Sequence, residues 1–221
     1  MLLFMPHAAP HARRYALIGG VLFSLFVMLG IYAWHVKQAH WEVGVLRWLQ
    51  DDGQPGLRPV SVALAVAGTG VPWAVLIALI GVALLLSAGL RVAVLLVVTA
   101  VLQDVGAMIK MFVERGRPAD GPVEVWRHVG SYSFPSGHTL GATLVFGFLF
   151  FAIEHCALGT RLKRLLQAAC LAWIVLMGIG RMELGAHWPT DVLGAYALGG
   201  LLLLPVIAVL RRPALAHAHR T

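Results

Sequence analysis

The chain has 221 residues, of which 59% are hydrophobic and 12% are charged. Soluble domains average about 45–50% apolar and about 25% charged residues, so this composition excludes an ordinary soluble protein. A bilayer accommodates the apolar excess, which indicates a membrane protein with several spans. The net charge of +7 does not indicate nucleic-acid binding, because Lys and Arg lie between apolar runs rather than in basic stretches interleaved with aromatic residues.

The first apolar run covers residues 15–34 and directly follows Arg13 and Arg14. These residues carry no charge, and a run of about 20 is enough to cross a bilayer and longer than the apolar part of a signal peptide. We therefore expect a retained first membrane helix.

A polar segment follows at residues 37–58. Within it Trp41, Val45 and Trp48 recur at the spacing of one helix face. This pattern favours a short amphipathic helix that lies in the membrane interface between the first two spans. The Asp-Asp-Gly sequence at 51–53 predicts a turn after it.

The uncharged stretch 59–90 is too long for one span, and the Gly-Thr-Gly-Val-Pro sequence at 68–72 interrupts it. We expect a short helix before the interruption and the second membrane helix after it, over 71–90. The other four spans are predicted from the apolar runs 91–111, 136–154, 165–180 and 192–210. The sequence thus predicts an all-α bundle of six membrane helices in a single domain (1–221), with a core at about 60–210 and tails at 1–14 and 213–221.

Residues suited to phosphate chemistry gather in three short segments. Alternation of the spans puts all three segments at the same membrane face, where they can form one site. They are Lys110-x6-Arg117-Pro118 at the end of the third span, Pro135-Ser136-Gly137-His138 at the start of the fourth, and Arg181-x5-His187-x3-Asp191 between the fifth and the sixth.

Five of these residues suit phosphate binding. Arginine forks match the oxygens of a phosphate and lysine adds a point charge, which fits Arg117, Arg181 and Lys110. Ser136 and Gly137 open a predicted helix, where free N–H groups and the positive end of the helix dipole bind anions. Ser136 is also expected to cap that helix.

The remaining three residues suit phosphoryl transfer. A nucleophilic histidine needs a neutral ring nitrogen facing phosphorus and a partner for its other nitrogen, and Asp191 lies four residues after His187. His138 can protonate the leaving alcohol and later activate water.

The three patterns, in this order, resemble those of the type-2 phosphatidic acid phosphatase superfamily, which also includes soluble vanadium haloperoxidases. The resemblance covers about residues 60–210. It implies a metal-independent lipid phosphatase that forms a phosphohistidine on His187, without a metal site or a cofactor. The third pattern usually begins Ser-Arg, whereas this chain has Gly180-Arg181, so that a hydroxyl contact is lost and the arginine is kept.

The resemblance leaves the substrate open among lipid phosphates. The candidates are undecaprenyl diphosphate, phosphatidylglycerophosphate, phosphatidic acid and lipid A phosphates. A phosphotransferase using the same intermediate stays open, since a lipid hydroxyl can replace water. A non-catalytic lipid-phosphate binder or transporter is disfavoured, because binding alone does not require His138, His187 and Asp191 together. The oligomeric state is not predicted.

The distribution of Lys and Arg predicts the orientation. With the N-terminus inside, nine of the 17 Lys and Arg lie inside, against five outside once Lys110, Arg117 and Arg181 are set aside. The positive-inside rule then favours cytoplasmic N- and C-termini. The three motifs are expected on the outer, periplasmic face of the inner (plasma) membrane.

Three charged residues stand outside this scheme. Arg115 falls outside the first pattern and is interpreted as an ordinary flanking charge. Asp104 lies about 9 Å deeper than Lys110 along a helix, and a structural role is favoured for it. The role of Glu183, near the third motif, is left undecided.

Overall fold

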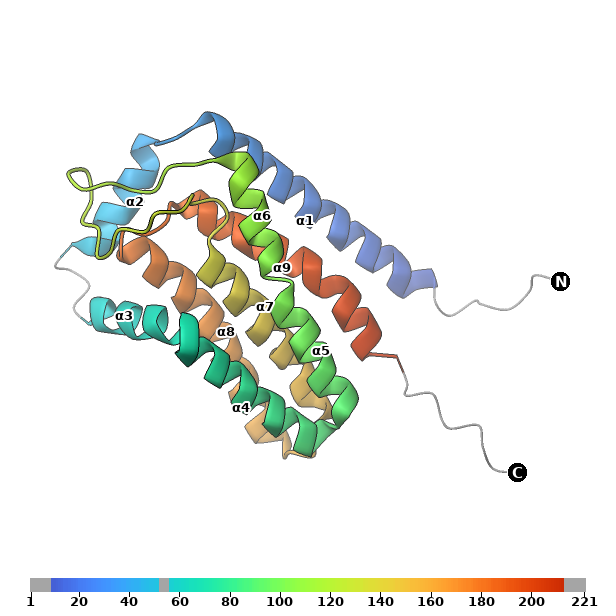
Figure 1. Cartoon of the computed structure of the whole chain (residues 1–221). Helices are drawn as coiled ribbons and strands as arrows, with labels where there is room; N and C mark the ends of the chain where they lie inside the picture. The colour runs from blue at the N-terminus through green and yellow to red at the C-terminus, as the bar shows by residue number, and fades with distance from the viewer. Residues whose placement is uncertain (1–8, 52–55, 213–221) are drawn as a thin grey trace, which may run out of the picture.

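The computed structural model describes residues 9–51 and 56–212. Over these ranges the regular structure is helical, as Figure 1 shows. The helices are α1 (Ala9–His35), α2 (His40–Gln50), α3 (Leu57–Ala67), α4 (Gly70–Ala88), α5 (Leu90–Val101), α6 (Asp104–Val113), α7 (Gly137–Ala152), α8 (Thr160–Glu183) and α9 (Pro189–Leu210), with a 3₁₀ turn at Ile153–His155.

Six stretches in the described residues are long and apolar enough to cross a membrane. They are α1, α4, the pair α5–α6, α7 with its 3₁₀ turn, α8 and α9. The predicted all-α plan of six membrane helices is therefore confirmed. The expected short helix before the interruption is α3. Of the predicted tails, 1–8 and 213–221 lie outside the described residues, as do Asp52 and Gly53 of the expected turn.

The third span differs from the expected single helix. It is divided at residues 102–103, where α5 ends and α6 begins. The backbone tightens here: Gln103 N donates to Ala100 O and Gly106 N donates to Gln103 O, both across three residues instead of four. The polar residues Gln103 and Asp104 stand at this division, but the overall length and hydrophobicity of the run still predict a single span.

Helix α7 lies at the centre of the bundle and packs against α5, α8 and α9 (Figure 1). Most of its side chains are buried in the apolar core. Small residues allow the close approach: a Cβ on Gly199 of α9 would come within 2.6 Å of Thr143 Cγ2. Helix α1 packs along α9 at the edge of the bundle. The start of α7 is thereby fixed within the surrounding helices.

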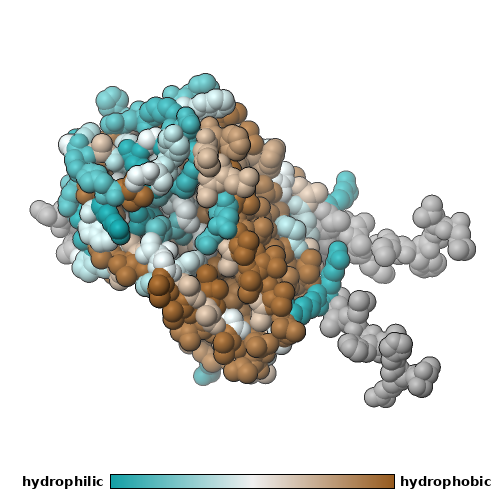
Figure 2. All heavy atoms as spheres, viewed as in Figure 1, coloured by the Kyte–Doolittle hydropathy of each residue, from teal (hydrophilic) through white to brown (hydrophobic). Residues whose placement is uncertain are grey.

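The two ends of the bundle differ in polarity. Figure 2 shows apolar side chains over the helical body and hydrophilic residues over the end that carries α2 and the loop 114–136. At the opposite end Arg211 donates to the Tyr15 hydroxyl at 3.2 Å, and Arg91 donates to the carbonyl of Arg212 at 2.8 Å. The bundle therefore has an apolar belt between two polar ends.

Helix α2 is the amphipathic helix expected between the first two spans, but two of its sides carry apolar residues. Trp41 and Trp48 are exposed, at 50% and 62%. The other side is buried against the bundle, and it includes a carboxylate, that of Glu42, together with Leu46 and Leu49. The sequence pattern of tryptophans predicted the first side and not the second.

Candidate active site

The three motifs meet at the hydrophilic end of the bundle. The first lies on α6 and the loop after it, the second opens α7, and the third joins α8 to α9. Backbone hydrogen bonds hold them together: Ser136 N donates to Asp191 O at 3.1 Å, and Ser133 N donates to Arg115 O at 2.8 Å. The eight predicted site residues are therefore brought to one region.

His187 lies at the centre of this region and is 1% exposed. Its Nε2 is 3.0 Å from Nη1 of Arg117. A guanidinium only donates, so Nε2 carries the lone pair and Nδ1 carries the ring proton. Nδ1 faces Oδ2 of Asp191 at 3.4 Å. Burial lowers the pKa of His187 well below its ordinary 6.5, and the nearby charges of Arg117 and Lys110 lower the pKa further. The ring is thus neutral, as a nucleophile requires.

Asp191 is fully buried in the first turn of α9. Its Oδ2 accepts a hydrogen bond from Trp188 N at 2.9 Å, and its Oδ1 accepts one from Nη1 of Arg115, also at 2.9 Å. Pro189 starts the helix at a position where its missing N–H costs nothing. The carboxylate is therefore held in one orientation next to His187.

Arg117 and Lys110 are anchored by backbone carbonyls. Arg117 donates to Ser131 O and Ala186 O, each at 2.7 Å. Lys110 donates to Tyr132 O at 2.8 Å and to Ser133 O at 3.2 Å. These bonds tie the loop 114–136 to α6 and to the segment before α9, and both cations line one pocket with residues 129–132.

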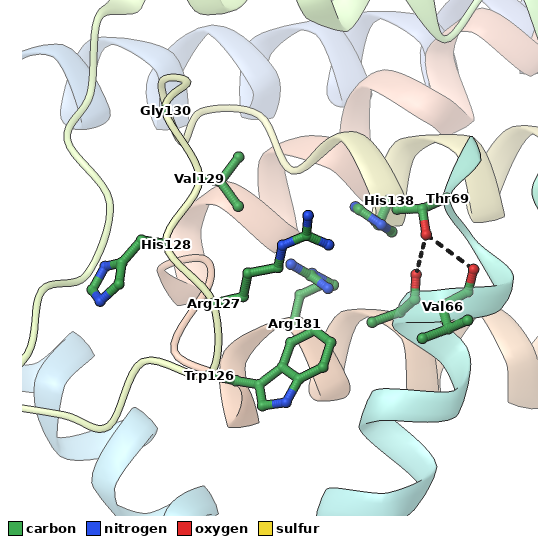
Figure 3. A pocket seen from close by; sticks show the side chains of 10 residues that line it. Val66, Thr69, Trp126, Arg127, His128, Val129, Gly130, His138 and Arg181 are labelled. Carbon is green, nitrogen blue, oxygen red and sulfur yellow. Dashed lines mark hydrogen bonds between the residues drawn. The ribbon is translucent and has the colours of Figure 1, made fainter.

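Arg181 is different, because its guanidinium makes no hydrogen bond within the described part of the chain, although the residue is only 6% exposed. It lines a cavity of about 420 Å³ together with His138 and the loop residues 126–130. In Figure 3 the side chains of Arg127 and Arg181 both extend into this space. The cavity therefore offers free cationic donors to an anion.

His138, the second residue of α7, faces the same cavity (Figure 3). Its Nε2 is buried without a partner among the described residues. The end of α3 supports the ring: a Cβ on Gly68 would lie 3.0 Å from Cδ2 of His138. Thr69 beside it donates to the carbonyls of Ala65 and Val66 at 3.1 and 3.0 Å, and makes no hydrogen bond to the histidine.

Ser136 and Gly137 form the start of α7 as expected, but the predicted side-chain cap is wrong. The Ser136 hydroxyl pairs with the Thr139 hydroxyl at 3.0 Å and makes no capping bond. Phe134 before them is fully buried and stacks on Phe26 of α1 at 5.7 Å. The segment is fixed by packing rather than by a cap.

The interpretation of Arg115 as a flanking charge is wrong. Its side chain is fully buried and forms ion pairs with Asp191 at 2.9 Å and with Glu42 of α2 at 2.6 Å. The Thr190 hydroxyl bonds to both Arg115 and Glu42. One signal was readable in the sequence: Glu42 shares a helix face with Leu46 and Leu49, where a lone carboxylate needs a buried partner.

Glu183 has a structural contact and lies away from the cavity lining. It is 2% exposed and pairs with Arg58, which also binds the exposed Glu124 at 3.0 Å. Gln50 donates to the carbonyls of Glu183 and Glu124 at 2.8 and 2.7 Å. Asp104 begins α6 with an exposed side chain. Among the described residues, no cluster of three His, Cys, Asp or Glu side chains could hold a metal ion.

Comparison with known proteins gives one family. The model of the PAP2 superfamily matches residues 81–213. Phosphatidylglycerophosphatase B of Bacillus subtilis is 37% identical over 100 residues, which is 45% of this chain and 48% of that protein. Phosphatidylglycerophosphatase B of Haemophilus influenzae is 38% identical over 87 residues, 38% of this chain and 35% of that protein. The aligned stretches thus span about half or less of these relatives.

A solved structure has the same fold. The crystal structure of a transmembrane PAP2-type phosphatidylglycerolphosphate phosphatase from Bacillus subtilis matches 91% of this chain and 98% of its own, with a TM-score of 0.76 and 24% sequence identity. The six-helix arrangement described above is therefore shared with a protein of known structure.

Proposed function

Because this chain belongs to the PAP2 superfamily, we propose that it is a membrane lipid phosphatase that works through a phosphohistidine on His187. The observation that carries the proposal is the setting of that ring. Its Nε2 lone pair faces Arg117 at 3.0 Å, and its Nδ1 proton faces Asp191 at 3.4 Å. The ring thus has a carboxylate on its Nδ1 side and a cation on its Nε2 side, the arrangement expected of an oriented nucleophile.

The first chemical step transfers the phosphoryl group to the enzyme. The lone pair of His187 Nε2 forms a bond to phosphorus while the bond from phosphorus to the ester oxygen breaks. His138 gives a proton to the departing oxygen, so that the product leaves as an alcohol. Arg117 and Arg181 bind the phosphoryl oxygens as charge shifts among them. The ring becomes an imidazolium, whose charge Asp191 stabilises.

The second step returns the enzyme to its starting state. A water oxygen adds to phosphorus as the bond between nitrogen and phosphorus breaks, and the electron pair returns to His187 Nε2. His138, now neutral, takes the proton that the water loses. Inorganic phosphate leaves. The cations Lys110, Arg117 and Arg181 neutralise the phosphate in both steps, so the scheme needs no metal ion.

The substrate we propose to test first is phosphatidylglycerophosphate, since the two relatives are named for it. An apolar belt next to the site suits a substrate whose tails stay in lipid. We propose that the chain acts as a single domain with cytoplasmic termini, so that the site opens on the outer, periplasmic face of the inner membrane.

Phosphate release tests the function. Purified protein in detergent with EDTA is expected to release phosphate from phosphatidylglycerophosphate, and His187→Ala to release none. His155→Ala, an exposed histidine away from the site, is the matched control and should keep full activity. Activity that survives His187→Ala would contradict the mechanism. Loss of phosphate release in EDTA, restored by a divalent cation, would contradict metal independence. Transfer of the phosphoryl group to an added acceptor lipid would identify a phosphotransferase.

Cysteine labelling tests the orientation. His128→Cys, on the loop over the cavity, is expected to react with a membrane-impermeant maleimide on intact cells. Arg161→Cys, exposed at the start of α8, should react only after permeabilisation. The native cysteines Cys156 and Cys170 are buried, which keeps the background low. The reverse pattern would place the site on the cytoplasmic face.

A further inference from the structure

A buried chain of charges lies behind His187 and reaches a helix far away in sequence. Glu42 of α2 accepts a hydrogen bond from Nη2 of Arg115 at 2.6 Å, and Nη1 of Arg115 donates to Oδ1 of Asp191 at 2.9 Å. All three charged side chains are 0% exposed. Groups of this kind are costly to bury and are retained where they are paired.

The charges of Glu42, Arg115 and Asp191 do not cancel one another. One guanidinium, that of Arg115, faces two carboxylates, which leaves one negative charge. If Arg115 were paired with Asp191 alone, it would offset the charge of that carboxylate. With Glu42 bound to the other side of the guanidinium, the Asp191 charge stays available to the ring of His187, 3.4 Å away.

The same contacts fix the position of Asp191. The Thr190 hydroxyl bonds to Oε1 of Glu42 at 2.6 Å and to Nη1 of Arg115 at 2.5 Å. The guanidinium also lies 5.6 Å from the ring centre of Trp188, a cation–π distance. Helix α2 therefore holds the first turn of α9, which carries the orienting carboxylate.

We propose that Glu42 is a positioning residue for the nucleophile. Glu42 acts through Arg115, which holds Asp191 next to His187. The pairing of Glu42 with Arg115 also keeps the negative charge of Asp191 available to the imidazolium. This inference rests on the proposed function. Glu42 lies outside the region 81–213 that matches the family model. The segment between the first two spans is thus part of the active site of this chain and does more than anchor it at the interface.

The first test substitutes the carboxylate by its amide. Glu42→Gln keeps the shape and one acceptor, and should lower kcat about 10- to 100-fold, as expected for loss of a group that orients a histidine, while KM changes less than about twofold. Asp51→Asn, the same change at the exposed end of α2, is the control and should leave both values unchanged. A Glu42→Gln enzyme with normal kcat would overturn the proposal.

The second test separates positioning from a merely structural role. If Glu42 acts through Asp191, then Glu42→Gln should add little to the loss already caused by Asp191→Asn, because the two residues belong to one unit. If the fold-losses in kcat of the two single variants multiply in the double variant, Glu42 acts independently of Asp191, and the proposal would be overturned. Glu42→Asp keeps the charge and should recover part of kcat.

Orthovanadate binding gives a readout that needs no turnover. Vanadate can take the Nε2 of His187 as a fifth ligand, so its dissociation constant, followed by tryptophan fluorescence, should rise strongly in His187→Ala and about 10-fold in Glu42→Gln. If the wild type binds vanadate but hydrolyses no lipid phosphate, the proposed function is wrong. The vanadate dissociation constant of Glu42→Gln then still tests the positioning role of Glu42. An unchanged constant in Glu42→Gln would overturn the positioning role alone. Vanadate that binds wild type no better than His187→Ala would overturn both.

Discussion

Nη1 of Arg117 donates to Nε2 of His187 across 3.0 Å and so covers the nitrogen that we assign as the nucleophile. The same Nη1 donates to the carbonyl of Ala186 at 2.7 Å. A phosphate oxygen is a better acceptor for a guanidinium than a neutral nitrogen, because the bond is between opposite charges. We therefore expect an incoming phosphate to draw Arg117 away from the ring and to expose the lone pair of Nε2.

Arg117→Lys tests this exchange. Lysine keeps the charge but loses the fork, and removal of one donor to a developing anion typically costs about 10²–10³ in kcat. We expect a loss of that size, with a raised KM, in phosphate release from the lipid substrate. Arg161→Lys, at the exposed start of α8, serves as control. Wild-type kinetics in Arg117→Lys would show that the fork does not take part.

Arg127→Gln tests whether Arg127 recognises the phosphodiester of the lipid headgroup. Arg127 shares the cavity with Arg181 but lies on the exposed loop (Figure 3). Phosphatidylglycerophosphate has a phosphodiester next to its terminal phosphate, whereas phosphatidic acid has none. Loss of a charged hydrogen bond to that group should raise KM about tenfold for the first lipid and leave the second nearly unchanged. Equal effects on both lipids would assign Arg127 to the terminal phosphate instead.

Gly194→Ala tests the packing behind the phosphate site. A Cβ at this position would come within 2.4 Å of Cε2 of Phe134, so the buried ring must shift and take the start of α7 with it. Overpacking of this kind typically costs about 1–3 kcal/mol. We expect a lower melting temperature in detergent and a lower kcat. Gly20→Ala on α1, where a Cβ meets nothing within 4 Å, should change neither.

The pH dependence of stability tests the burial of His187. Its pKa is lowered in the folded protein by burial and by the surrounding cations. As the pH falls below about 6.5, His187 binds a proton in the unfolded chain but stays neutral in the folded protein. The free energy of unfolding therefore decreases by up to about 1.4 kcal/mol per pH unit. The decrease stops once the pH reaches the folded pKa. His187→Asn should show a shallower decrease over this window in urea titrations, and parallel curves would mean that the ring is not shielded.

The sequence predicted the spans and the motifs because both follow local rules. An apolar run of about 20 residues has few alternatives to a membrane helix, and alternation of spans brings Lys110, His138 and His187 to one end. The division of α5 from α6 falls at Gln103 and Asp104, a polar pair inside the apolar run, but two polar residues alone do not specify the tightened backbone found there.

The contacts of Arg115 and Glu42 could not be predicted in the same way. They are separated by 73 residues, and no spacing rule connects α2 to the loop after α6. The sequence predicts a flanking charge at Arg115 because this residue falls outside the first pattern. Only the fold shows that the side chain turns inward, where it contacts Asp191.

The separation of Glu42 from its partners also sets when the centre can be completed during synthesis. Glu42 leaves the ribosome 73 residues before Arg115 and 148 residues before Thr190. Until α9 has entered the bilayer, Asp191 and Thr190 are missing, and within the buried network Glu42 can pair only with Arg115. We therefore expect the proposed phosphatase to stay inactive towards the surrounding lipids until α9 has inserted.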